Sequence, residues 1–186
     1  MYYDIFILGC LMDEPYYGYQ IKKKLTERFD VCTTINNNTL YSLLKQYEKM
    51  GVITKTVAIL AGKPNRNIYS ITDEGKKYFV EILRDFPDSL SRNRDEYMMR
   101  LYYFHLLDIP TRVKILEMRE RYLNAAIDSI MSLQDVAATV FIPNRSELRE
   151  FHLRLLQSER MLIAEMRKKV NDPCPISDEG ECYLHQ

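Results

Sequence analysis

A helix over residues 38–50 would have two faces of different chemistry. Its apolar face consists of Leu40, Leu43, Leu44, Tyr47 and Met50. Residues three and four positions apart share a helix face, and this spacing leaves an opposite face of Thr39, Ser42, Lys45, Gln46 and Lys49. Serine, threonine and glutamine side chains form hydrogen bonds with base edges in the major groove of DNA, whereas lysine binds phosphates or guanine. Any solvated amphipathic helix also presents polar residues outward, so this face indicates DNA contact only together with its surroundings.

A basic turn follows this helix. Residues 52–58 are rich in β-branched side chains and residues 67–71 form a second short extended run, a pattern typical of a β-hairpin. Between them lies the turn-prone stretch Ala61-Gly62-Lys63-Pro64-Asn65-Arg66. We expect this basic tip, with Lys63, Asn65 and Arg66, to contact the DNA backbone or the minor groove beside the helix. Exposed turns are often polar for other reasons, so the tip indicates DNA contact mainly through its position after the helix.

Motifs that enzymes use for catalysis are missing from the sequence. It has no glycine-rich phosphate loop, no HExxH pair and no nucleophile elbow, and it contains only 6 glycines. The histidines His105, His152 and His185 lie far apart, and Cys174, Cys182 and His185 lack the spacing of a zinc site. The sequence therefore predicts neither an enzyme nor a metal or cofactor site.

The net charge of zero hides an uneven distribution. Residues 1–87 carry 12 basic and 10 acidic side chains, residues 88–170 carry 14 and 12, and residues 171–186 carry four acidic ones. For a nucleic-acid partner, the location of the basic residues matters more than their number. The N-terminus lacks the basic and long apolar regions of a signal peptide, and the apolar run at 5–12 is too short to span a bilayer. We expect a cytoplasmic protein without a membrane partner.

Local signals predict the elements that lead into the helix at 38–50. The apolar run at 3–12 predicts a buried helix, which Glu14-Pro15 would end because proline lacks an amide proton. A second helix is expected over residues 17–29. The asparagines at 36–38 supply a cap for the third helix, since an asparagine oxygen accepts from the free amides of a first turn.

Other local signals close this region. Gly51 ends the third helix in the left-handed conformation that glycine adopts cheaply. After the hairpin, Thr72 caps a further helix that runs to about residue 86. Three helices, a hairpin and a helix follow the order of a winged helix-turn-helix. We therefore expect a mainly α fold with a two-stranded wing over residues 1–87.

The chain after Pro87 has an all-helical pattern. We expect helices over 88–107, 110–133 and 147–170, the last capped by Ser146. Two of them carry heptad-like apolar stripes, which consist of Leu116, Leu123, Ile127 and Ile130 on one helix and Leu148, Leu155, Leu162 and Met166 on the other. We assign the stripes and residues 88–170 to dimerisation; the alternative is that they pack on each other within one chain. Residues 171–186 are expected to form a disordered acidic tail.

Aromatic and methionine side chains crowd one short segment, at Tyr97, Met98, Met99, Tyr102, Tyr103 and Phe104. Ligand pockets are mostly apolar with a few polar groups, so this cluster could line an effector site. The simpler interpretation is that it forms core between the two halves of the chain.

Five segments follow one another with regular spacing over about residues 5–80. They are Ile7-Leu8-Gly9-Cys10-Leu11, Gly18-Tyr19-Gln20-Ile21, Thr39-Leu40-Tyr41-Ser42-Leu43-Leu44, Gly51-Val52-Ile53 and Tyr69-Ser70-Ile71-Thr72-Asp73-Glu74-Gly75. Together they resemble the PadR family of transcriptional regulators. Two positions depart from the family pattern, because Tyr17 stands where a histidine is common and Ser42 where a proline is common.

The resemblance implies a homodimer that binds an inverted-repeat operator in double-stranded DNA, as a repressor released by a small-molecule effector. It also implies that Thr39, Tyr41, Ser42 and the wing from Lys63 to Arg66 lie near DNA. The alternative is a winged-helix module that binds a protein instead of DNA. Such a module would lack the basic wing and the small polar residues of the third helix, and this chain has both. The sequence therefore predicts a DNA-binding transcriptional regulator.

Overall fold

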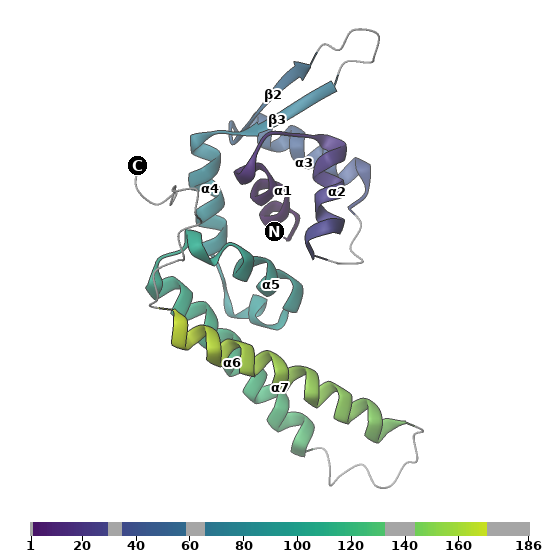
Figure 1. Cartoon of the computed structure of the whole chain (residues 1–186), viewed down its shortest axis with the longest axis vertical. Coiled ribbons are helices and arrows are strands. Elements are labelled where there is room, and N and C mark those ends of the chain that lie inside the picture. Colours follow the sequence, from purple (N-terminus) through teal and green to yellow (C-terminus); the bar gives the residue numbers. More distant parts are fainter. Residues whose placement is uncertain (1, 30–34, 59–65, 133–143, 171–186) are drawn as a thin grey trace. The chain divides into compact units, whose positions relative to one another are not determined.

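The computed structural model describes residues 2–29, 35–58, 66–132 and 144–170 (Figure 1). The chain divides into two compact units, one of Met1–Asp85 with Met98–Tyr103 and the other of Phe86–Tyr97 with Phe104–Gln186. The described parts of both are mainly helical, and the first also holds a small antiparallel sheet. The predicted fold class is thus confirmed. No helix in the described part of the chain is long and apolar enough to span a membrane.

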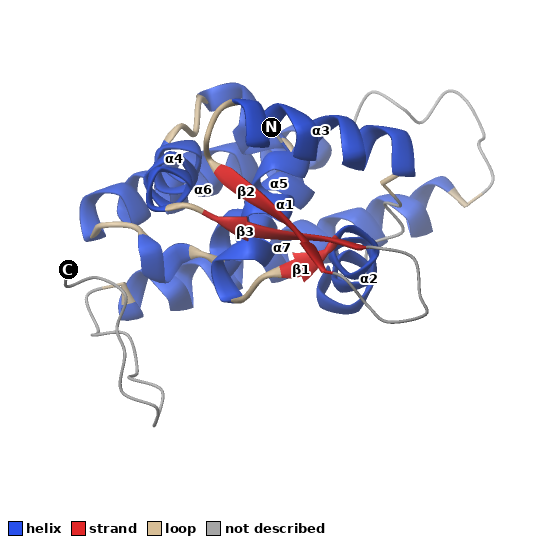
Figure 2. Ribbon diagram, turned by 90° about the horizontal axis from the view of Figure 1, so that it is seen from above, coloured by secondary structure: helices blue, strands red, loops and turns tan. Residues whose placement is uncertain are grey.

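The sheet of the first unit has three strands, β1 (Tyr16–Tyr17), β2 (Ile53–Ala58) and β3 (Arg66–Ile71), in the order β1-β3-β2 (Figure 2). Strands β2 and β3 form the predicted hairpin. The sequence did not predict β1, and the expected helix start at Tyr17 is wrong because Tyr17 pairs with Ile68 of β3. Arg66, expected in the turn, is the first residue of β3 and lies opposite Ala58.

Four helices surround this sheet: α1 (Tyr2–Asp13), α2 (Gly18–Phe29), α3 (Asn37–Lys49) and α4 (Asp73–Arg84). The predicted caps are confirmed. The Asn36 side chain accepts from the Thr39 amide at 2.8 Å, and the Thr72 hydroxyl accepts from the Gly75 amide at 3.0 Å. Gly51 has a φ of 75°, the left-handed conformation expected after α3.

The core of the first unit forms around α1, whose residues Ile5, Phe6, Ile7, Leu8 and Cys10 are fully buried. The buried Tyr47 of α3 donates a hydrogen bond to Asp4 of α1, which ties these two helices together. The fully buried Arg100 donates to the carbonyl oxygens of Ile82 at 3.3 Å and Asp85 at 3.0 Å. Its guanidinium thereby satisfies carbonyls that the end of α4 leaves unpaired.

The expected single helix over 88–107 is wrong. The segment instead contains a 3-10 helix η1 (Asp88–Arg92), α5 (Arg94–Tyr102) and a second 3-10 helix η2 (Phe104–Leu106). The break before α5 has a local cause, because the Asn93 side chain accepts from the Glu96 amide at 3.1 Å and so caps a new helix.

The aromatic cluster of this segment is divided between the two units. Tyr103 packs edge-on against Phe79 in the first unit, whereas Tyr97 contacts Phe86 in the second. Both tyrosines are buried, so this part of the cluster is core and not the lining of an open pocket.

The second unit is dominated by α6 (Ile109–Ser132) and α7 (Arg145–Lys169), which run side by side in opposite directions (Figure 1). An ion pair joins them in the interior: Arg119 Nε lies 2.7 Å from Glu159 Oε1, and the two residues are only 2% and 6% exposed. Arg119 also donates to the carbonyl oxygen of Ser91 and lies over the rings of Tyr97 and Tyr122. The pair therefore holds α6, α7 and η1 together.

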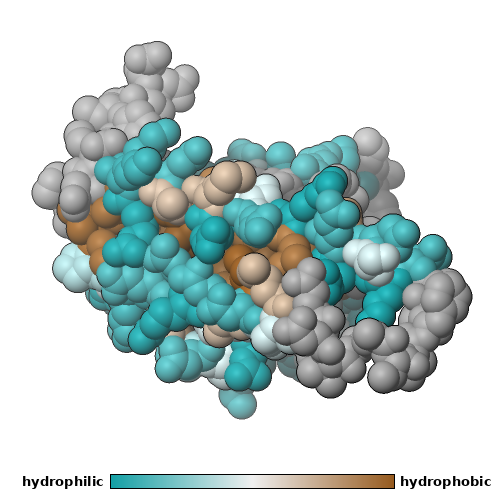
Figure 3. All heavy atoms as spheres, turned by 90° about the horizontal axis from the view of Figure 1, so that it is seen from below, coloured by the Kyte–Doolittle hydropathy of each residue, from teal (hydrophilic) through white to brown (hydrophobic). Residues whose placement is uncertain are grey.

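The apolar stripes of α6 and α7 have different environments. Leu116, Leu123 and Ile127 of α6 are buried within the unit. On α7, in contrast, the buried face is Leu156, Glu159 and Ile163. Four large apolar residues of α7 at helical spacing are exposed, and we call them the α7 apolar stripe: Leu148, Phe151, Leu155 and Leu162. Figure 3 shows one face of the molecule, on which hydrophobic residues (brown) reach the surface and are bordered by hydrophilic residues (teal).

Two further expectations concern the ends of α7. The expected cap at Ser146 is wrong, because α7 begins after Asn144, which has a φ of 59° and makes no side-chain cap. The Ser146 hydroxyl instead bonds to Glu147. The tail at 171–186 lies outside the described residues, and the domain boundaries at 87 and 170 stay predictions.

Candidate nucleic-acid interface

Helix α3 separates its apolar and polar residues much as its periodicity predicted. Leu40, Leu44 and Tyr47 are buried, whereas Met50 is 46% exposed and was wrongly placed on the buried face. The opposite face is open to solvent, with Thr39 partly buried and the other members exposed, Tyr41 by about half. We call this set the α3 polar face: Thr39, Tyr41, Ser42, Lys45, Gln46 and Lys49.

The two lysines of the α3 polar face carry charge that no described neighbour neutralises. Neither Lys45 nor Lys49 forms an ion pair within the described part of the chain, whereas the adjacent Glu48 is paired with Lys55 at 3.1 Å. Gln46 makes only a weak contact with the Met50 sulfur, at 4.0 Å. The polar groups of this face are thus available to an incoming partner.

Arg66 lies at the loop end of the hairpin, as the first residue of β3, and turns toward the start of α2. Its guanidinium carbon is 5.5 Å from the ring centroid of Tyr19 and 6.0 Å from that of Tyr17. These two rings are stacked, with centroids 5.8 Å apart and an interplanar angle of 12°. The other two wing residues expected at the tip, Lys63 and Asn65, lie outside the described residues.

A hollow of about 640 Å³ opens between the start of α2, the α3 polar face and β3. We call it the tyrosine hollow; its lining is Tyr17, Gly18, Tyr19, Tyr41, Arg66, Asn67 and Tyr69. Of the residues predicted to bind DNA, it brings together Tyr41 and Arg66. Tyr17 and Tyr19 were missed as site residues, although both lie in or beside a segment that carries the family resemblance.

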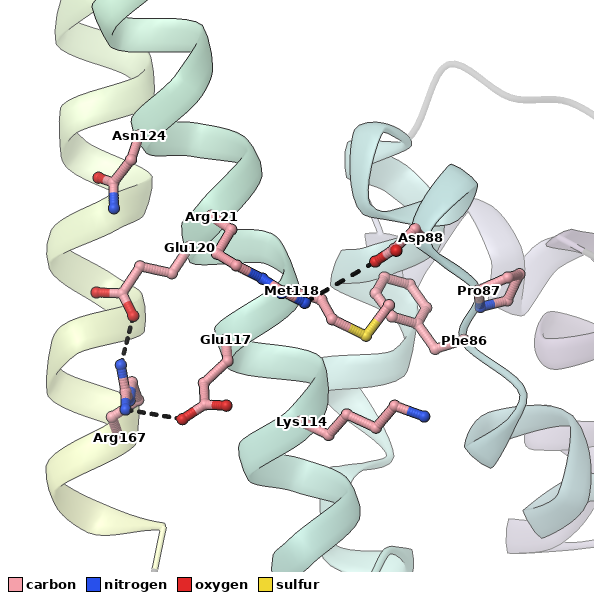
Figure 4. A pocket seen from close by; sticks show the side chains of 10 residues that line it. All are labelled: Phe86, Pro87, Asp88, Lys114, Glu117, Met118, Glu120, Arg121, Asn124 and Arg167. Atoms are coloured by element: carbon pink, nitrogen blue, oxygen red, sulfur yellow. Dashed lines mark hydrogen bonds and ion pairs between the residues drawn. The ribbon is translucent and has the colours of Figure 1, made fainter.

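The second unit has a hollow of about 530 Å³ between η1 and α6, with Arg167 of α7 at its side (Figure 4). Phe86, Pro87 and Met118 supply apolar surface. Arg167 donates to Glu117 at 3.1 Å and also binds Glu120, and Arg121 lies 4.0 Å from Asp88. Because these acidic and basic groups largely compensate each other, the hollow does not select strongly for either charge.

The described residues contain no group of three or more His, Cys, Asp and Glu side chains that could hold a metal ion.

Comparison with known proteins places the chain in a family. The model of the transcriptional regulator PadR-like family matches residues 7–81. A solved PadR family transcription regulator from Clostridium difficile R20291 is 31% identical; the match covers 44% of this chain and 82% of that one, with a TM-score of 0.38. The chain belongs to the PadR-like family of transcriptional regulators. This confirms the family expected from the five segments, and it assigns the protein to regulators and not to enzymes.

PadR of Bacillus subtilis is similar to this PadR-like regulator both as a curated sequence and as a solved structure. The negative transcriptional regulator PadR of Bacillus subtilis is 27% identical over 104 residues, which are 54% of this chain and 56% of that protein. The solved structure of Bacillus subtilis PadR in complex with operator DNA is 18% identical and covers 91% of this chain and 99% of that one, with a TM-score of 0.43. The sequence match to the negative transcriptional regulator PadR thus spans little more than half of that protein's length.

Proposed function

We propose that this PadR-like regulator binds double-stranded DNA in a sequence-specific way through the α3 polar face. The observation that carries the proposal is the separation of buried and exposed residues on α3. Leu40, Leu44 and Tyr47 hold the helix against the core, and the exposed side carries polar groups and two lysines that form no ion pair with a described residue. The major groove of DNA, roughly 12 Å wide, accepts an α-helix in this orientation.

The residues of the α3 polar face have different roles in this proposal. Ser42 and Gln46 form hydrogen bonds with base edges, because their side chains offer donors and acceptors that match bases in the major groove. Lys45 and Lys49 neutralise phosphates, which adds affinity without adding sequence preference. Thr39 and Tyr41 contact the DNA near the start of the helix.

The hairpin contributes a second contact. Arg66, at the loop end of β3, and, from the sequence, Lys63 and Asn65 at the tip bind the backbone or minor groove next to the major groove that α3 occupies. This role rests on the basic character of the segment and on its position directly after α3.

The proposal includes a homodimer on an inverted repeat. The α7 apolar stripe supports it, since large apolar side chains in a row on one helix face favour burial against another protein surface. A symmetric pair of such helices forms an interface of the same residues from both subunits. Two-fold symmetry then places the two α3 helices in successive major grooves, about 34 Å apart.

We further propose that the protein represses transcription, acts in the cytoplasm and is released by a small molecule. The negative transcriptional regulator among its relatives supports repression. The hollow of the second unit, with its apolar side chains and nearby charges, supports a place for an effector.

Selection of bound fragments from a genomic library tests DNA binding directly. The full-length protein should enrich fragments that share an inverted repeat with half-sites about 10 base pairs apart, centre to centre. A Gln46→Ala variant serves as the comparison and should enrich fragments with a weaker preference at one base position. No retention of any fragment at low salt, where phosphate contacts are strongest, would contradict the proposal and favour a protein-binding module.

A further inference from the structure

We propose that the tyrosine hollow binds one backbone phosphate of the DNA, beside the bases that the α3 polar face reads. This inference rests on the proposed function, and it assigns Tyr19 and Tyr17 to the interface with Arg66. Its starting point is the placement of Arg66, whose guanidinium lies over two stacked tyrosine rings within a hollow of about 640 Å³.

The stacked rings orient Arg66 without neutralising it. A guanidinium over an aromatic face is attracted by the ring electrons and keeps its charge. Arg66 forms no ion pair with any other described residue, and its hydrogen bond from Nη1 to the Tyr19 hydroxyl is long, at 3.5 Å. Arginine has five N–H donors in a planar fork, so most of them remain available to a ligand with several oxygen acceptors.

The hydroxyl groups of the hollow add neutral donors beside this cation. Tyr19 and Tyr41 are 52% and 47% exposed, and both line the hollow together with Asn67. Phosphate oxygens in protein–DNA complexes accept from arginine and from tyrosine and asparagine side chains. The lining thus combines one fixed cation with several neutral donors, and none of its described residues is a carboxylate that would repel a phosphate.

The position of Tyr41 connects the hollow to the groove-reading helix. Tyr41 belongs to the α3 polar face and at the same time to the wall of the hollow. A duplex that takes α3 into its major groove would therefore present the adjacent strand of its backbone to the hollow. Bound in this way, the phosphate fixes the register of the helix on the duplex.

A small aromatic ligand fits this site less well than a phosphate. Such a ligand would need open ring faces on which to stack, but Tyr17 and Tyr19 already stack on each other and carry the Arg66 guanidinium. The free chemistry of the site is its donors and its charge, which is the chemistry that binds a phosphodiester.

Two conservative variants of the full-length protein test the inference, Arg66→Gln and Tyr19→Phe. The probe is one fixed duplex of about 40 base pairs, and its affinity is measured by fluorescence anisotropy over a series of salt concentrations. Arg66→Gln should reduce the slope of log affinity against log salt by about 0.9 per protomer, since one phosphate contact is lost. Tyr19→Phe keeps the ring under Arg66 and should weaken binding about tenfold with little change in slope, because it removes only a hydrogen bond to a charged group.

Lys77→Gln is the matched control. Lys77 is an exposed cation of α4 paired with Glu74, and it does not line the hollow. Its loss should leave affinity and slope as in the wild type. Neutral methylphosphonate replacements, placed one at a time along the duplex, should reveal a position that weakens wild-type binding and leaves Arg66→Gln binding unchanged.

The outcomes separate this inference from the proposed function. If Arg66→Gln and Tyr19→Phe both bind like Lys77→Gln while Lys45→Gln with Lys49→Gln binds poorly, the hollow holds no phosphate and the role of α3 stands. Absence of wild-type binding at low salt overturns both. A thermal melt of each variant, equal to that of the wild type, establishes that a loss of binding is not a loss of folding.

Discussion

Gly18, the first residue of α2, lies directly against the ring of Tyr41 on α3. A Cβ atom at position 18 would come within 2.8 Å of Tyr41 Cε1 and 2.9 Å of its hydroxyl oxygen. The backbone at Gly18 does not need glycine for its conformation, because its φ angle is not positive. Among the described glycines, a positive φ is found at Gly51. What requires glycine at position 18 is therefore the close approach of the Tyr41 side chain.

Gly18→Ala should displace the Tyr41 ring and weaken DNA binding with little loss of stability. The clash involves the end of a half-exposed side chain, which can rotate away, and alanine suits a helix better than glycine by up to about 1 kcal/mol. Titration of duplex DNA by anisotropy, with a thermal melt alongside, measures both effects. In a Tyr41→Ala background the same substitution should have no further effect on binding; an equal loss in both backgrounds would show that Gly18 does not act through Tyr41.

Breaking the Arg119–Glu159 pair should destabilise the protein strongly. Glu159→Gln leaves the buried Arg119 charge without its 2.7 Å carboxylate partner, and the loss of one partner of a buried pair typically removes about 3–5 kcal/mol of stability. Replacement of both residues by methionine should recover much of this loss, because no unpaired charge remains in the interior. Urea unfolding of Glu159→Gln and of the double methionine variant measures both effects. Equal stability of Glu159→Gln and the wild type would mean that the pair is not buried in solution.

Tyr97→Phe should make the protein more resistant to alkaline pH. Burial raises the pKa of Tyr97 above its ordinary value of 10.0, and the nearby Glu159 charge raises it further. A phenol whose pKa is higher in the folded state contributes stability that is fully present below pH 10 and is lost as the pH rises above it. Phenylalanine at this position removes that loss.

The same substitution should be close to neutral at pH 7. The Tyr97 hydroxyl is buried and has no hydrogen-bond partner in the described structure, so its removal breaks no bond. Tyr47→Phe is the informative comparison, since it deletes the hydrogen bond to Asp4 and should lower stability already at pH 7. Unfolding midpoints in urea between neutral pH and about pH 11 distinguish the two; a steeper alkaline loss in Tyr97→Phe than in the wild type would contradict the prediction.

Charges in the α7 apolar stripe should dissociate the proposed dimer. Leu155→Glu with Leu162→Glu places two carboxylates in a surface that must lose water on association, and this should yield a monomer in sedimentation velocity. Gln157→Glu is the control, because this exposed residue lies on the other side of α7. A dimer that persists in the double variant would place the interface elsewhere on the protein.

The α3 polar face could be predicted from the sequence because its signals are local. Three signals define this helix within one or two turns of it. They are the alternation of leucines with small polar residues, the asparagine cap before the helix and Gly51 after it. The break at Asn93 was equally local, since Asn93 and Glu96 have the spacing of a capping box. We missed it because the segment contains no proline or glycine.

The tyrosine hollow and the buried face of α7 could not be predicted in the same way. The hollow depends on the pairing of Tyr17 with Ile68, which are distant in the sequence, and a two-residue strand has no measurable periodicity. On α7 the buried face includes the charged Glu159, whose partner Arg119 lies on another helix. The apolar periodicity of α7 therefore indicates the exposed stripe that we assign to dimerisation, and it does not indicate the face that packs on α6.

The most direct test of the account compares two pairs of lysines in the same DNA-binding titration. Lys45→Gln with Lys49→Gln alters the α3 polar face, whereas Lys76→Gln with Lys77→Gln removes the same charge from α4, where both lysines are paired with acidic neighbours. We expect the α3 variant to lose about 0.9 in salt slope per lysine and to bind weakly, while the α4 variant binds like the wild type. Equal binding by the two variants would show that the exposed face of α3 is not where DNA binds.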